Sequence, residues 1–425
     1  MVENLRKIWK TEEIRKKIIY TFLMLLLYRL VSVIPAPGID KAALNSATGA
    51  SSLPLLELVN MMTGNAFSQM TIMAMGITPY INSSIIMQLL TIAIPALERM
   101  QNDESGQGRE KIARITRYVT VGLAALQAIG LVAGLGYIKS GALNYILVGL
   151  SMAGGTAFAM WQGERITEKG LGNGISLLIF VGIISNLFNG VVSGFTSATT
   201  TSGFVNTLII LALAIILTMC VTYVELGERR IPLMISKQTR GRRVYGGQNT
   251  RMTLKVVSVG VLPLIFAYSF MAFPGTIVAL CDSDYSSGFA QWWQANMSSG
   301  STLYILITAL LIIAFTFFYS SISFDPKKQA EQLQMQGATI PGQRGKNTYQ
   351  YLKNTVNRLN LFAALYLAIL SAIPSLLTRS LNQSVPFAAS SILIAVSVAL
   401  ETIRAVQGEM SIRGVDMDVE KGGFM

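Results

Sequence analysis

The chain has 425 residues, of which 52% are hydrophobic and only 13% are charged. An average soluble protein carries about 25% charged residues, so this composition cannot cover several water-exposed domains. The sequence contains no histidine, which excludes the commonest general base, the commonest zinc ligand and histidine-dependent nucleophilic catalysis. The formal charge of +12 indicates that one side of the protein meets an acidic partner, such as lipid headgroups, nucleic acid or an acidic protein.

Ten stretches of the sequence are long and apolar enough to span a membrane as helices, since a span needs about 20 mostly apolar residues. The first stretch is expected to be retained, because Pro35-Ala36-Pro37-Gly38 follows it in place of a small-residue cleavage site. The sequence therefore predicts an all-α polytopic membrane protein with ten transmembrane helices. In chain order the stretches are 18–34, 71–94, 115–136, 142–161, 175–195, 208–224, 256–280, 303–322, 361–377 and 386–406.

The basic residues predict which side of the membrane each connection faces, because connections rich in Lys and Arg stay in the cytoplasm. With a cytoplasmic N-terminus, all but four of the 34 Lys and Arg residues fall on the cytoplasmic side. The exceptions are Lys41, Lys139 and Arg379 on the outside, and Arg29 within the first span. We therefore expect both termini to be cytoplasmic.

The predicted spans divide evenly, five in an N-terminal half, 1–200, and five in a C-terminal half, 201–425. With an odd number of spans each, two halves of the same fold would be inverted copies, and many transporters place a central path between such halves. The ionisable residues within spans, Arg29, Glu401 and Arg404, lie nearer an end than the centre. The membrane interior thus lacks the charge relay that ion-coupled transporters usually keep.

Uncharged polar residues do recur within three of the spans. They either make ordinary hydrogen bonds between helices or line a seam that opens, and both interpretations remain at this stage. The segment 53–67, on the outside, is too short and too polar to span, so it either caps an external cavity or lies flat on the membrane. The polar residues within spans are Asn82, Ser83, Ser84, Gln88, Gln127, Tyr268 and Ser269.

Two long connections on the predicted cytoplasmic side, 225–255 and 325–358, are rich in Arg, Gly and Thr. We expect them to project and to dock an RNA-rich or acidic protein surface, because Arg makes forked contacts to phosphate and carboxylate. The glycine-rich turn Gly170–Gly174 joins two membrane helices with no strand before it, so it is not a dinucleotide-binding fingerprint. Asn173 or Gly174 is expected to cap the fifth span.

Six segments, spread in order along nearly the whole chain, carry family-specific motifs. They are MAMGITPYINSSIIMQLL (73–90), GERITEKGLGNGISLLIF (163–180), ELGERRIPL (225–233), LPLIFAYSFMAFP (262–274), SFDPKKQAEQLQMQGATIPGQR (323–344) and the last span with its tail. In these motifs the chain resembles the SecY family, the central subunits of the bacterial protein-conducting channel. The resemblance implies two inverted five-helix halves around a central pore, with no catalytic residue, cofactor or metal.

The resemblance also implies site residues of four kinds. A ring of branched apolar side chains closes the pore, because such side chains resist wetting yet give way around a polypeptide. Taken alone, these isoleucines are expected to be packing or lipid-facing residues, and composition does not assign them to a pore. By resemblance, the ring residues are Ile77, Ile81, Ile179, Ile183, Ile265 and Ile394. The plug, 53–67, would cap the pore and includes Leu55, Leu56, Leu58, Val59, Met61 and Met62.

The lateral gate, the seam through which apolar segments leave for lipid, would include Asn82, Gln127 and Phe273. The contacts to a motor or ribosome would include Arg229, Arg230, Arg240, Arg242, Arg243, Arg344 and Lys346.

The same resemblance implies the partners and the place of action. These are the SecE and SecG subunits, the SecA ATPase, the ribosome, signal peptides, secretory or membrane-protein substrates and lipids of the bacterial cytoplasmic membrane. The chain has no phosphate-binding loop, so a partner must supply the energy. After Arg344 the sequence departs from the family, because Gly345 stands where a proline is usual, and a more flexible loop tip is expected.

Two rival functions are compatible with a polytopic membrane protein. A solute transporter could use the same inverted architecture, although the lack of mid-membrane charge and the large basic connections disfavour it. An intramembrane enzyme is disfavoured by the absence of histidine and of paired carboxylates. The favoured function is a passive, partner-driven polypeptide channel with a side exit to lipid.

Overall fold

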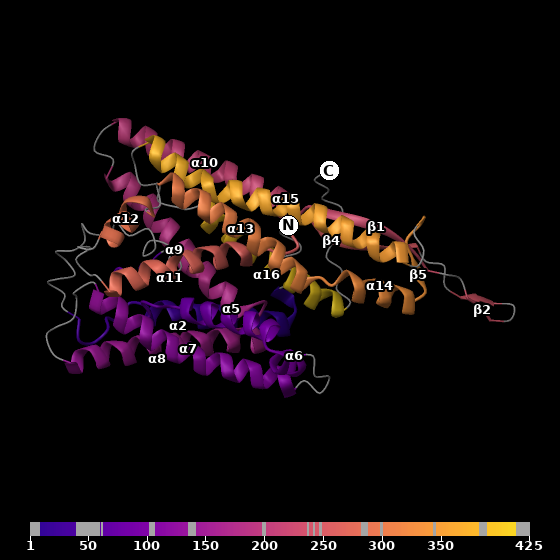
Figure 1. The fold of residues 1–425 in the computed structure, drawn as a ribbon, viewed down its shortest axis with the longest axis horizontal. Helices are drawn as coiled ribbons and strands as arrows, with labels where there is room; N and C mark the ends of the chain where they lie inside the picture. Colours follow the sequence, from indigo (N-terminus) through magenta and orange to yellow (C-terminus); the bar gives the residue numbers. More distant parts are fainter. Residues whose placement is uncertain are drawn as a thin grey trace. The chain divides into compact units, whose positions relative to one another are not determined.

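The computed structural model describes residues 9–39, 60, 63–101, 107–134, 142–197, 201–235, 238–240, 243–245, 249–281, 288–297, 301–342, 346–381 and 389–413. Contacts divide the chain into two compact units, which are described separately below. Unit 1 comprises Met1–Thr207, Ser269–Ser299 and Ile394–Met425, and unit 2 comprises Leu208–Tyr268 and Gly300–Leu393. Helices dominate both units (Figure 1).

Unit 1 is built from helices that pack along their length. Helix α7 packs against α5 and α8, and α8 also contacts α2 and α9. Three further helices, α10, α11 and α16, have residues in both units. The helices are α2 (Glu12–Val31), α5 (Thr78–Ala93), α6 (Pro95–Gln101), α7 (Gln107–Gly134), α8 (Ala142–Lys169), α9 (Gly174–Ser197), α10 (Thr201–Glu225), α11 (Leu262–Cys281), α12 (Gly288–Asn296) and α16 (Ala389–Ile412).

Unit 2 combines helices with two small antiparallel sheets. Helix α13 (Thr302–Ser323) packs against α15 (Lys346–Leu381), and α14 (Pro326–Met335) also contacts α15. One sheet has the order β4-β1-β5, and the other pairs β2 with β3. The strands are β1 (Glu228–Ile235), β2 (Gln238–Arg240), β3 (Arg243–Tyr245), β4 (Asn249–Lys255) and β5 (Ala338–Thr339).

The predicted helical membrane fold is confirmed. Each of the ten predicted stretches contains a helix in the described part of the chain, and six of the helices are long and apolar enough to cross a membrane. The consecutive helices α5 and α6 would pass that test as a pair, but they are bent by 108° at their junction. Exposed apolar side chains such as Phe22, Leu126 and Ile216 suit a surface that faces lipid rather than water.

The second predicted span differs from the structure at its start. Thr71 forms an isolated β-bridge with Pro35, residues 72–77 form turns, and α5 begins at Thr78, with Pro79 in its first helical turn. Proline is tolerated there because its missing N–H would have no intrahelical acceptor. Gly76, two positions before this start, has a φ of +50°, a backbone conformation that residues with a Cβ rarely adopt.

The turn Gly170–Gly174 does cap α9, as predicted. The side chain of Asn173 accepts hydrogen bonds from the backbone N–H groups of Ile175, at 3.1 Å, and Ser176, at 3.4 Å. Gly174 is required by close packing, because a Cβ atom added there would lie 2.1 Å from the carbonyl oxygen of Gly163 on α8. This turn therefore fixes the start of α9 against the end of α8.

Candidate functional site

The segment just before α5 forms a compact polar turn in unit 1. Asn60 organises it: its amide donates to Oδ1 of Asn65 at 2.9 Å, and its own Oδ1 accepts from the backbone N–H of Ser68 at 3.0 Å. The backbone N–H of Asn65 also donates to the carbonyl oxygen of Asn60 at 3.0 Å. Residues 63–67 of this turn are the described end of the predicted plug. They are therefore held in a defined conformation by local hydrogen bonds.

Two buried residues of this turn, Thr63 and Gly64, pack closely against α9 and the start of α5. A Cβ atom added at Gly64 would lie 3.1 Å from the carbonyl oxygen of Gly182 on α9. A Cβ atom added at Gly76 would lie 2.7 Å from Cγ2 of Thr63. Gly182 directly precedes Ile183, and Gly76 directly precedes Ile77. The described end of the predicted plug thus lies beside two backbone positions that precede predicted ring residues.

All six predicted ring isoleucines are buried, and none is more than 9% exposed. The contrast within α9 is clear, because Ile183 is 2% exposed whereas its neighbour Ile184 is 46% exposed. Ile179 and Ile183 are one helical turn apart and therefore lie on the same face of α9. Burial at all six positions suits ordinary packing as well as a pore ring, so the ring stays a prediction. Ile77, Ile81, Ile179, Ile183 and Ile394 belong to unit 1, and Ile265 belongs to unit 2.

Arg29, near the end of α2, is a contact residue that the sequence analysis did not assign to the site. It is half-buried, and its Nη1 donates to the carbonyl oxygen of Gly64 at 3.4 Å, while its Nη2 donates to Oγ of Ser185 on α9. It borders a cavity of about 580 Å³, together with Ser32, Asn65 and Gln69. The signal that could have found it is its charge within a predicted span, which by default marks a functional position.

The predicted gate residues on α5 and α7 are partly buried in unit 1. Oδ1 of Asn82 is buried without a hydrogen-bond partner among the described residues, and so are the hydroxyl oxygens of Thr78 and Ser83 on the same helix. Such atoms destabilise a tightly packed state by about 1–3 kcal/mol each. Gln127 is partly buried on α7. Phe273 lies on α11, and its side chain is outside the described part of the chain.

Most of the predicted plug lies outside the described residues. This holds for all six apolar residues assigned to it, so their role stays a prediction. They are Leu55, Leu56, Leu58, Val59, Met61 and Met62.

In unit 2 the two basic connections meet in one small folded module, which the sequence analysis did not predict. Strand β1, from the first connection, pairs with β4 and also with β5 from the second connection. Alternate residues of β1 face inward, so Ile231 and Leu233 are buried while Arg230 and Pro232 are exposed. The apolar core of the module contains Ile231, Leu233, Leu254, Leu333, Ala338, Ile340, Leu352 and Val356.

The predicted docking residues are distributed over this module. Arg229 and Arg230 are exposed on β1. The backbones of Arg240 and Arg243 face each other across the β2–β3 hairpin. Lys346 starts α15. Arg242 and Arg344 lie outside the described residues, and so do the side chains of Arg240, Arg243 and Lys346.

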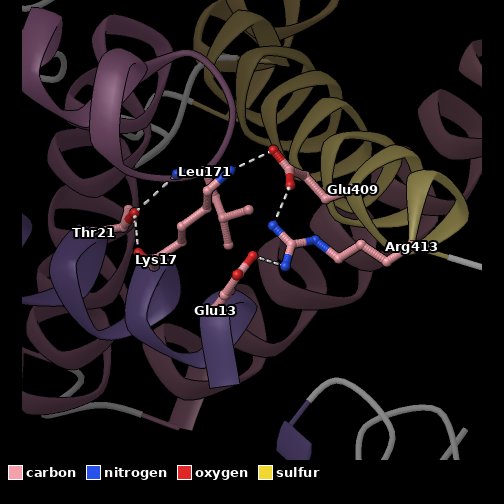
Figure 2. Close-up of polar contacts among 6 residues, drawn as sticks. All are labelled: Glu13, Lys17, Thr21, Leu171, Glu409 and Arg413. Carbon is pink, nitrogen blue, oxygen red and sulfur yellow. Dashed lines mark hydrogen bonds and ion pairs between the residues drawn. The ribbon is translucent and has the colours of Figure 1, made fainter. Parts of the chain in front are cut away.

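A cluster of charges joins α2 to α16 in unit 1 (Figure 2). Nζ of Lys17 lies 2.5 Å from Oε1 of Glu409, and Arg413 contacts both Glu409, at 3.6 Å, and Glu13. One turn further along α2, the hydroxyl of Thr21 accepts a hydrogen bond from the backbone N–H of Leu171 at 3.1 Å. The first and last described helices of the chain and the turn before α9 are therefore linked.

At the start of α2, the acid–base equilibrium of one carboxyl group is shifted. A hydrogen bond and the positive charge of Lys16, with a smaller contribution from Arg15, lower the pKa of Glu12. The carboxylate of Glu12 lies 2.9 Å from Nζ of Lys16 and is well exposed. Water screens such pairs, so this contact contributes little to stability. It is a surface feature of α2 and not part of the cluster with α16.

Comparison with known proteins identifies the family. The SecY family model matches residues 71–403. The chain belongs to the SecY family. The protein translocase subunit SecY of Streptomyces scabiei is 37% identical over 439 residues, which cover 98% of this chain and 99% of that protein. The corresponding protein of Escherichia coli strain K12 is 37% identical over 411 residues, which cover 93% of this chain and 91% of that protein.

Solved structures agree on the SecY fold. A protein-conducting channel has a TM-score of 0.69 to this chain at 19% identity, and Sec61 in the canine ribosome-channel complex has a TM-score of 0.63 at 17% identity. Each match covers 95% of both chains. The chain is therefore a multi-pass membrane protein with the SecY fold, and the comparisons do not support the solute-transporter alternative.

Proposed function

We propose that this chain forms the channel through which unfolded secretory polypeptides cross the bacterial cytoplasmic membrane. One observation carries the proposal beyond family membership: Thr63 and Gly64, at the described end of the predicted plug, pack beside Gly76 and Gly182. These glycines precede the buried residues Ile77 and Ile183. A plug seated next to an apolar constriction is the arrangement that a channel needs to stay closed between substrates.

The ring would seal the channel by excluding water. Isoleucine side chains offer water and ions no hydrogen bond, so a narrow constriction of them gates by dewetting. A passing polypeptide displaces the side chains without having to match any of their polar groups. The constriction therefore accepts substrates of any sequence, as a general secretion channel must.

The lateral gate would release apolar segments into lipid. Each Leu, Ile, Phe or Val at the centre of a segment favours the membrane by about 0.3–0.6 kcal/mol. The buried oxygens of Thr78, Asn82 and Ser83, which lack partners in the described chain, would make the closed gate less stable than full apolar packing. A modest binding energy from a signal peptide would then suffice to open it.

The driving force would come from a partner that docks on the folded module of unit 2. We propose the SecA ATPase and the ribosome as these partners, with SecE and SecG as further subunits of the channel. Sec61, which shares the fold, is known in a ribosome-channel complex. The exposed Arg229 and Arg230 suit an acidic protein surface or RNA. Both termini and the module would lie in the cytoplasm, following the distribution of basic residues.

Reconstitution tests the proposal. The chain is inserted into vesicles with SecE, and SecA, ATP and an unfolded protein bearing a signal peptide are added outside. Protease-protected substrate inside the vesicles is the expected result, and it should depend on ATP and on the signal peptide. Uptake of small solutes without any protected polypeptide would overturn the proposal.

A further inference from the structure

Arg29 is the one residue of the predicted first span that carries a charge, and its partners in the structure are specific. Its two terminal nitrogens donate to different elements: Nη1 to the carbonyl oxygen of Gly64 and Nη2 to Oγ of Ser185 on α9. Ser185 lies two positions after Ile183. Arg29 therefore links the described end of the predicted plug to the helix that carries two predicted ring residues.

We propose that Arg29 is a positioning residue that holds Gly64 against α9 and thereby stabilises the closed channel. This inference rests on the proposed function, and it adds a residue that lies neither in the ring nor in the plug. The guanidinium would act on the permeation path through Gly64, not by touching substrate. This role would explain why the first span carries a charged residue, since charges within spans are costly and are usually kept for function.

The packing at Gly64 supports this role. A Cβ atom added at Gly64 would lie 2.5 Å from Nη1 of Arg29 and 3.1 Å from the carbonyl oxygen of Gly182. The φ of +64° at Gly64 is also a conformation that residues with a Cβ rarely adopt. The guanidinium, the glycine and the α9 backbone thus form one close-packed junction, in which a side chain at position 64 would displace the guanidinium.

The other end of the turn is held independently of Arg29. The backbone N–H of Ala36 donates to the carbonyl oxygen of Met70 at 3.0 Å. The backbone N–H of Ile72 donates to the carbonyl oxygen of Ile34 at 2.9 Å. Phe67 and Met70 are buried in an apolar cluster of unit 1. Loss of the Arg29 contacts should therefore free Thr63 and Gly64 to move away from α9, while residues 67–72 stay in place.

The adjacent cavity allows the contact to break reversibly. It has a volume of about 580 Å³ and is lined by Arg29, Ser32, Asn65 and Gln69, among others. A cavity of this size and polarity can hold several waters. When Gly64 leaves, the guanidinium can be solvated there, so the open state need not bury an unpaired charge. Opening therefore has a modest rather than a prohibitive energy cost.

Arginine suits this position better than lysine. Its planar fork presents donors to two acceptors at once in a fixed geometry, whereas an ammonium group is a compact point charge. We therefore expect Arg29→Lys to retain part of the effect and Arg29→Gln to lose it. Removing a hydrogen bond to a charged group corresponds to a shift of about tenfold or more in a two-state equilibrium.

The test measures resting ion conductance of vesicles that contain the chain with SecE, without SecA or substrate. Arg29→Gln should raise the conductance about tenfold, and Arg29→Lys should raise it less. Ser185→Ala should raise it in the same direction. The Arg29→Gln/Ser185→Ala double variant should add little to Arg29→Gln, because Arg29→Gln already removes the contact with Ser185. Arg165→Gln is the matched control, since Arg165 forms an exposed pair with Glu168 within α8, away from the plug and from α9 residue Ser185 in sequence.

A thermal unfolding measurement on each variant separates positioning from stability. Unchanged conductance in Arg29→Gln and Ser185→Ala, or additive effects in the double variant, would overturn the inference. If Arg29→Gln does not fold, the resting conductance of Ser185→Ala alone tests the inference, and an unchanged value overturns it. Polypeptide translocation by the unaltered chain is measured in parallel: its failure contradicts the proposed function, whereas normal translocation with unchanged variant conductance contradicts only the role of Arg29.

Discussion

Lys17 on α2 and Glu409 on α16 form an ion pair of 2.5 Å although they are 392 positions apart in the chain. Their side chains are only 29% and 32% exposed. Arg413 extends the contact by reaching both Glu409 and Glu13. Because a network of partly buried charges is less screened than a single surface pair, this cluster is expected to stabilise unit 1 by holding α16 on α2.

Reversing one charge of this pair should destabilise the protein. Lys17→Glu would place three carboxylates together, and we expect a loss of about 1 kcal/mol and a lower thermal unfolding midpoint. The double exchange Lys17→Glu/Glu409→Lys should recover much of the loss. The control is the exposed pair Lys16–Glu12, with side chains 72% and 67% exposed, where the same exchange should change little. Equal effects at both pairs would contradict the role given to the cluster.

Gly174 should not tolerate any side chain. Gly174→Ala would place a Cβ atom 2.1 Å from the carbonyl oxygen of Gly163, and the backbone of α8 cannot move away cheaply. We expect a destabilisation of about 3 kcal/mol, measured as a lower thermal unfolding midpoint or a loss of folded protein. Gly122→Ala is the matched control, because no atom of the described residues lies within 4 Å of its Cβ position and alanine favours a helix by about 1 kcal/mol. A tolerated Gly174→Ala would show that the turn can adjust.

The helices could be predicted from the sequence because a lipid environment demands long apolar runs with internally satisfied backbones. The cap at Asn173 was also predictable, since it depends only on local chemistry. The sheet in unit 2 was not, because β1 and β5 come from connections far apart in the sequence. The alternating pattern of β1, with Ile231 and Leu233 buried, is too short to distinguish a strand from an irregular loop.

The candidate site was predictable in its residue types but not in its contacts. The isoleucines were assigned by resemblance, and their burial agrees with an inward-facing role while leaving the ring itself a prediction. Arg29 was visible as a charge within a span, yet its partners Gly64 and Ser185 lie 35 and 156 positions away. Only the folded chain brings these three residues together, so no local pattern could have revealed the junction.

The ring assignment predicts opposite results for two neighbouring isoleucines. Ile183→Asn should place an amide in the constriction, let water enter and raise the resting ion conductance several-fold. Ile184→Asn, at the exposed neighbouring position, should leave the conductance unchanged. Ile81→Asn and Ile394→Asn should behave like Ile183→Asn and should also pass substrates with weak signal peptides. Unchanged conductance in all three buried variants would argue against the ring.

The module in unit 2 predicts a separation between docking and stability. Arg229→Glu/Arg230→Glu reverses two exposed charges on β1, so ATP-driven translocation should fall about tenfold or more while the thermal unfolding midpoint hardly changes. Leu233→Ala is the contrasting variant: it removes a buried side chain from the core of the module and should cost about 2–5 kcal/mol. Raising the salt concentration should weaken SecA binding by the unaltered chain more than by the charge-reversed one, because screening acts on the attractive charges. Translocation that survives both charge reversals would place the motor contact elsewhere on the chain.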